Sequence, residues 1–136
     1  MNITIEDQVR AWARGLYPHE AAVELLIRSG KVVYPGAPWL MVGDALAAVD
    51  VDRLSSEADA WSSGERALVD IAVSLLGGVP VDLGDTIASL DRENLDAVLA
   101  AIAHAGGSHQ HSEIVQGAHR GTAELVTLPS LHPWPV

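Results

Sequence analysis

The chain has 136 residues, a formal charge of −10 and no cysteine. Its 18 acidic residues outnumber its eight basic ones, so no basic cluster is available for phosphates, which disfavours nucleic acids and anionic membranes as partners. Disulfides and thiolate metal sites are excluded. No apolar run approaches the about 20 residues that span a bilayer, and residues 1–10 lack the pattern of a secretory signal, so we expect a cytoplasmic location.

Two helices are predicted at the start of the chain. Thr4 and Asp7 have the spacing of an N-terminal cap, and apolar residues then recur at helical intervals, which predicts a helix at residues 5–15. Pro18 suits the first turn of a second helix, and Gly30 is the predicted stop.

The next region is predicted to be a loop followed by two shorter helices. Residues 31–38 hold two prolines and a glycine, which is typical of a loop. Residues 39–50 are predicted to be helical. Asp50 or Asp52 can then cap a short helix at residues 54–60.

The most complete predicted helix lies at residues 61–78, with the sequence WSSGERALVDIAVSLLGG. Ser62 and Glu65 have the spacing of a capping box, and Gly77 is the predicted left-handed residue at the helix end. A single narrow polar line runs from Arg66 to Ser74, and apolar residues cover the rest. This pattern indicates a central helix around which the others pack.

The last part of the chain is predicted to contain two more helices and an extension. A helix follows the proline-containing loop after Gly78, and Asp91 can cap a long helix that ends at Gly106 and Gly107. Beyond Ser108, SEIVQG and TAELVTL allow a β-hairpin. The last eight residues are proline-rich, and we expect them to be mobile or docked through Trp134.

The predicted fold is therefore mainly α, a compact bundle of five to seven helices with a small hairpin near the C-terminus. We expect a helical domain at residues 1–107 and an extension, hairpin or irregular, at 108–136. Residues 43–54 align with residues 84–95, which suggests two related helix-loop-helix-helix units, although chance similarity explains the match equally well.

The densest group of candidate ligands contains His104, His109, His111 and His119. In an extended segment, His109 and His111 lie on one side, where they could bind zinc or nickel. Glu113 is the nearest carboxylate for a hydrolytic site. The alternative is a solvated glycine-serine loop that happens to contain histidines.

A second candidate surface is acidic. The shortage of compensating bases suggests a face that docks another protein, with a basic protein as a candidate, whereas the alternative is that several of these residues only cap helices. The candidate partner-binding residues are Asp82, Asp85, Asp91, Glu93, Asp96 and Trp134.

Two stretches resemble known proteins. WSSGERALVDIA resembles the signature segment of ABC-type and SMC-type ATPases, but the chain has no Gly-x-x-x-x-Gly-Lys-Ser/Thr phosphate loop, which disfavours nucleotide binding. YPHEAAVELLIRSG, WSSGERALVDIAVSL and LDRENLDAVLAAIAHA together resemble small uncharacterised helical proteins of actinobacteria, their phages and other mobile elements. That resemblance implies a helical fold and carries no activity or site residue.

The function that the sequence favours is a small acidic interaction or adaptor protein of a mobile-element or defence setting. One alternative is a metal-binding protein or metal-dependent hydrolase with zinc or nickel at the histidines. Another is a structural homodimer. No Ser-His-Asp set can be assembled, so an enzyme is the less favoured class, and we predict no catalytic residue and no other cofactor.

Overall fold

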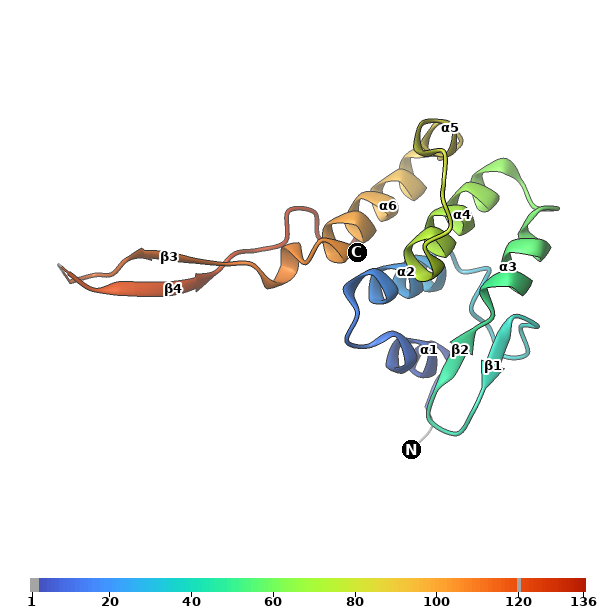
Figure 1. The fold of residues 1–136 in the computed structure, drawn as a ribbon, viewed down its shortest axis with the longest axis horizontal. Helices are drawn as coiled ribbons and strands as arrows, with labels where there is room; N and C mark the ends of the chain where they lie inside the picture. Colours follow the sequence, from blue (N-terminus) through green and yellow to red (C-terminus); the bar gives the residue numbers. More distant parts are fainter. Residues whose placement is uncertain (1–2, 120) are drawn as a thin grey trace.

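The computed structural model describes residues 3–119 and 121–136 (Figure 1). They form α1 (Ile5–Ala13), α2 (Tyr17–Arg28), β1 (Leu40–Val42), β2 (Ala47–Val49), α3 (Val51–Ala58), α4 (Ser63–Gly77), α5 (Leu83–Ala88), α6 (Arg92–Ala105), a 3-10 turn (Ser108–Gln110), β3 (Ser112–Gln116) and β4 (Ala123–Thr127). The predicted mainly helical fold with a C-terminal hairpin is confirmed. Within the described ranges, no helix has both the length and the apolar character needed to cross a membrane.

Side-chain caps mark the start of the α-helices in the described residues except α2, which begins at Tyr17 without one. Thr4 Oγ1 accepts from the Asp7 N–H at 3.1 Å, and Asp91 Oδ1 accepts from the Asn94 N–H at 2.7 Å. Asp50, Ser62 and Asp82 cap α3, α4 and α5 in the same way. Each such cap is worth about 1 kcal/mol. Hydroxyl and carboxylate caps in the sequence therefore mark where five of these helices begin.

The end of α4 differs from the prediction by one residue. Gly77 is the last helical residue, and Gly78 adopts the left-handed conformation, with φ of 68°. The Gly78 N–H donates to the Ser74 carbonyl at 2.9 Å, which continues the helical hydrogen bonding by one more residue. Glycine suits position 78, which is left-handed, because it has no Cβ to clash with the backbone.

The core is centred on two helices rather than on α4 alone. α2 packs against α1, α4 and α6. It buries five apolar residues between these neighbours, including the fully buried Leu25 and Leu26. α4 buries six, from Ala67 to Val73. α4 in turn packs against α2, α3, α5 and α6, so α2 and α4 share the middle of the bundle, a position that the sequence predicted for α4 alone.

The predicted helix at residues 39–50 is wrong, because this stretch forms the antiparallel hairpin β1–β2. The Gly43 N–H donates to the Leu46 carbonyl at 2.8 Å and closes the turn. Ala47 and Val49 are buried, and β2 packs against α1. The Gln8 side chain of α1 also donates to the Gly43 carbonyl at 3.0 Å. Contacts with α1 thus override the helical preference of an alanine-rich stretch.

The proposed repeat has no counterpart in the secondary structure. Residues 43–54 form the turn after β1, strand β2 and the start of α3, whereas residues 84–95 form α5 and the start of α6. α2 and α4 do pack against each other, but different elements follow them. The two helix-loop-helix-helix units are therefore not present.

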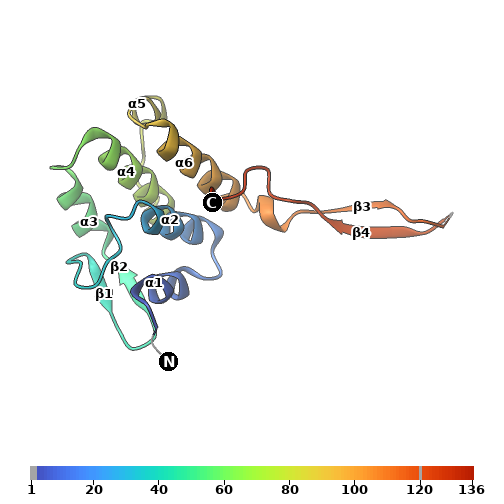
Figure 2. The same ribbon diagram turned by 180° about the vertical axis from the view of Figure 1, so that it is seen from behind.

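The second hairpin, β3–β4, projects from one end of the helical body as an arm (Figures 1 and 2). All ten of its strand residues are exposed. The chain then returns to the body, where the Leu131 N–H donates to Ser108 Oγ at 2.7 Å and Trp134 packs on the core. The division of the chain after residue 107 stays a prediction.

Candidate metal centre

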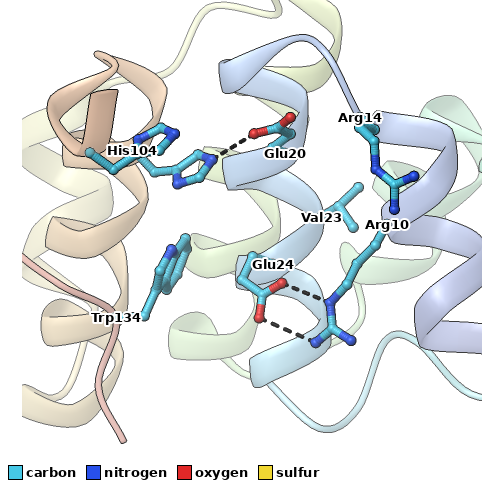
Figure 3. Close-up of a pocket in the computed structure, with 8 residues that line it drawn as sticks. Arg10, Arg14, Glu20, Val23, Glu24, His104 and Trp134 are labelled. Atoms are coloured by element: carbon cyan, nitrogen blue, oxygen red, sulfur yellow. Dashed lines mark hydrogen bonds and ion pairs between the residues drawn. The ribbon is translucent and has the colours of Figure 1, made fainter. Parts of the chain in front are cut away.

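A pocket of about 490 Å³ lies where α1, α2, the end of α6 and the returning C-terminal segment meet (Figure 3). Its lining is Arg10, Arg14, Glu20, Val23, Glu24, His104, His109 and Trp134. Trp134 forms one wall of this pocket, and the Arg28 guanidinium lies 5.0 Å from the centroid of its ring. The C-terminal segment therefore completes a site that the helices begin.

Two histidines lie together in this pocket. His104 is in the last turn of α6 and His109 is in the 3-10 turn that follows, with Gly107 between them at φ of 75°. That left-handed residue reverses the chain and stacks the two rings, with 3.9 Å between centroids and 7° between planes. Tyr17 contacts the His109 ring edge-on at 4.8 Å. A glycine suits this position because residues with a side chain rarely adopt its positive φ, and a Cβ there would already touch the Tyr17 ring at 3.4 Å.

Glu20 is the carboxylate of the cluster. Its Oε1 accepts from His104 Nε2 at 2.8 Å, and its Oε2 accepts from the Gly15 N–H at 2.9 Å. These two hydrogen bonds, that from Gly15 first, lower the pKa of Glu20. Glu20 therefore carries a negative charge beside the two imidazoles at neutral pH.

The neighbouring Glu24 is occupied by arginines instead. Its carboxylate accepts from Arg10 at 3.0 and 3.3 Å and from Arg28 at 3.2 Å. Arg10 lies 3.6 Å from Asp7 as well. Two of the positive charges near the pocket are thus balanced by acids, which reduces their repulsion of a bound cation.

His109 has an unusual environment for an imidazole. Its Nδ1 is buried and has no hydrogen-bond partner among the described residues. Burial lowers the pKa of His109, and the neighbouring His104 lowers it further. A buried nitrogen without a partner costs about 1–3 kcal/mol. His109 is therefore neutral at pH 7, which is the form in which histidine binds metals.

The spacing of the three side chains suits a single ion. One ligand atom from each of Glu20, His104 and His109 lies within 4.8 Å of the others. Two ligand atoms at tetrahedral positions about 2.1 Å from a zinc ion lie about 3.4 Å apart. Side-chain movements of about 1 Å would therefore bring all three onto one ion.

The structure brings together only part of the predicted histidine group. His104 and His109 are adjacent, whereas His111 and His119 are exposed, before β3 and in the loop between β3 and β4. Glu113, the predicted carboxylate, is exposed on β3. The carboxylate beside the histidines is Glu20 instead. The sequence does not reveal this role, because Glu20 lies 84 residues from His104 and belongs to the ordinary polar line of α2.

The residues of the predicted acidic surface make different local contacts. Asp82 and Asp91 cap helices, and Asp96 Oδ1 lies 2.6 Å from His132 Nε2. Asp85 and Glu93 are exposed in the first turns of α5 and α6. Trp134 lies in the pocket. Partner binding by these residues stays a prediction.

Comparison of the chain with protein-family models, with curated proteins and with solved structures returned no match. The resemblance to small helical proteins of actinobacteria and their mobile elements stays a prediction. The functional proposal therefore depends on the chemistry of the pocket.

Proposed function

We propose that the protein binds a divalent transition-metal ion through Glu20, His104 and His109. The observation that carries the proposal is the grouping of three ligand atoms within 4.8 Å, drawn from two regions of the chain. Two imidazoles and one carboxylate form a ligand set found in catalytic zinc sites. The partnerless, neutral His109 supports it, because metal binding compensates a buried nitrogen that lacks a hydrogen bond.

The bound ion would keep one position open. Three protein ligands leave the fourth tetrahedral position for water or another molecule, which is the arrangement of catalytic rather than structural zinc sites. The pocket beside it, at about 490 Å³, is within the size range of small-molecule sites. Zinc at such a position lowers the pKa of its water to about 7. This geometry is compatible with metal-assisted hydrolysis and with ligand sensing.

The proposal is tested by titrating metal-stripped, untagged protein with Zn²⁺ and with Ni²⁺ in a calorimeter. We expect one site per chain for at least one of the two metals. A free metal concentration 100-fold above Kd should add about 2.7 kcal/mol to the free energy of unfolding, seen as a higher Tm.

Matched variants locate the site. His109→Gln and Glu20→Gln should each weaken metal binding by about 100-fold, because each removes one of three ligands. His119→Gln is the control, since His119 is an exposed histidine outside the pocket. Absence of stoichiometric binding by the unaltered protein contradicts the proposal. Equal weakening by His119→Gln and His109→Gln also contradicts it.

The acidic adaptor function of a mobile-element or defence setting stays a prediction beside this proposal. Its support is the charge of −10 and the exposure of Asp85 and Glu93. Asp82 and Asp91 also cap helices and Asp96 contacts His132, although all three are exposed as well.

A further inference from the structure

The pocket beside the proposed metal site is lined by two arginines whose surroundings differ. Arg10 donates two hydrogen bonds to the Glu24 carboxylate, at 3.0 and 3.3 Å, and lies 3.6 Å from Asp7. Arg14 lines the same pocket, is exposed, and forms no ion pair or side-chain hydrogen bond with any residue that the structure describes. A guanidinium without a partner in its own protein is available to an anion from solution.

The backbone holds Arg14 beside the metal ligands. α1 ends at Ala13, and Arg14 is its C-terminal cap, immediately before Gly15 with φ of 105°. The Gly15 N–H donates to Glu20 Oε2 at 2.9 Å. Because only two covalent bonds separate Arg14 Cα from that nitrogen, Arg14 Cα lies within about 6 Å of the Glu20 carboxylate. The turn after α1 therefore keeps the arginine close to a proposed metal ligand.

The pocket has different chemistry at its two sides. Figure 3 shows Arg14 on the α1 side and His104 with Trp134 on the α6 side, and Val23 of α2 lies between them. Val23 and Trp134 give the space between the two sides an apolar lining. A ligand that reaches from the metal to Arg14 therefore needs a polar group at each end and an apolar middle.

The charge of the lining favours an anionic ligand once an ion is bound. The two arginines of the lining balance its two glutamates, and histidines bind metals as neutral imidazoles. A divalent ion therefore gives the pocket a formal charge of +2, although the formal charge of the whole chain is −10. A ligand with two negative charges balances this pocket, with one charge near the ion and the other near Arg14.

We propose that the metal-loaded pocket binds a small dicarboxylate, with one carboxylate at the open position of the ion and the other on the Arg14 guanidinium. This inference rests on the proposed metal site, which supplies the first of the two contacts. A guanidinium presents parallel N–H donors that match the two oxygens of one carboxylate. The volume of about 490 Å³ suits a ligand of this size, with its short carbon chain against Val23 and Trp134.

Paired ligands test the two contacts separately. Dicarboxylates from succinate to pimelate are titrated in a calorimeter into protein loaded with Zn²⁺ or Ni²⁺, whichever fills the site, each beside the monocarboxylate with the same number of carbons. We expect at least one dicarboxylate to bind at least about 10-fold more tightly than its monocarboxylate, because only the dicarboxylate contacts the ion and Arg14 together. Removal of the metal should weaken the binding of that dicarboxylate.

Matched arginine variants locate the second contact. Arg14→Gln should abolish the preference for the dicarboxylate without weakening metal binding, because Arg14 is not a metal ligand. Arg92→Gln removes the same charge from an exposed arginine at a different pocket and should keep the preference. Stoichiometric metal binding without any such preference overturns this inference and leaves the proposed function intact, whereas failure to bind metal overturns both. A preference that survives in Arg14→Gln, or that Arg92→Gln abolishes equally, also overturns this inference.

Discussion

The two β-hairpins of this protein have opposite relations to the helical body. β1–β2 has buried residues on its inner side, Leu40, Ala47 and Val49, and lies against α1. β3–β4 projects into solvent and has no buried residue. The first is held by packing with the core, whereas the second is held by its own ladder and by the contacts at its base.

The difference shows that a strand can arise for two separate reasons. β3 and β4 are rich in β-branched and alternating residues and were predictable from the chain itself. Residues 39–50 hold three alanines and two leucines, and form strands because α1 covers one of their sides. Local preference determines the exposed hairpin, and burial determines the covered one.

The largest expected effect is on the covered hairpin. Val49→Asp should lower the free energy of unfolding by about 3 kcal/mol or more, because Val49 is only 4% exposed and a charge there has no partner. Leu125→Asp, in the exposed hairpin, should change it by less than about 0.5 kcal/mol. Urea unfolding at micromolar protein concentration measures both. A similar loss in the two variants would contradict the distinction between the hairpins.

Hydrogen exchange should show a smaller difference between the unaltered hairpins. At low protein concentration, the paired amides of β3–β4 should exchange at least about 100-fold faster than those of β1–β2, a difference of about 2.7 kcal/mol. The reason is that the arm can open without exposing the core.

The smallest effect should be that of pH, and it concerns the base of the exposed arm. Because the pKa of His109 is lowered on folding, the folded state binds fewer protons than the unfolded one, and stability should fall as pH drops below about 6.5. The pKa of Glu20 is also lowered on folding, so the free energy of unfolding should fall further below about pH 4.5. Thermal unfolding of metal-free protein measures the trend. His109→Gln should flatten the first step, and an unchanged profile in this variant would assign that step to another group.

The fold was predictable wherever the signal was local. Thr4, Ser62 and Asp91 cap helices where the sequence placed them, because a cap depends on residues three positions apart. The hairpin at 39–50 was not predictable in this way. Its buried side becomes apparent only when α1, more than 30 residues earlier, lies against it, as the bond from Gln8 to Gly43 illustrates.

The candidate site was predictable only in part for the same reason. His104 and His109 are close in sequence and were recognised as candidate ligands, whereas His111 and His119 belong to the projecting arm. Glu20 reaches His104 because α2 packs along α6, a long-range contact that no spacing rule predicts. The role of Trp134 likewise depends on the return of the chain after β4.

The hydrogen bond between Ser108 and Leu131 has a consequence for how this molecule can vary. It joins the point where the chain leaves the body to the point where it returns, and a second bond, from the Leu128 N–H to the His111 carbonyl, lies just beyond it. The intervening residues therefore form a closed loop. Because doubling the length of a closed loop costs only about 0.6 kcal/mol, the arm can be lengthened, shortened or exchanged with little effect on the helices.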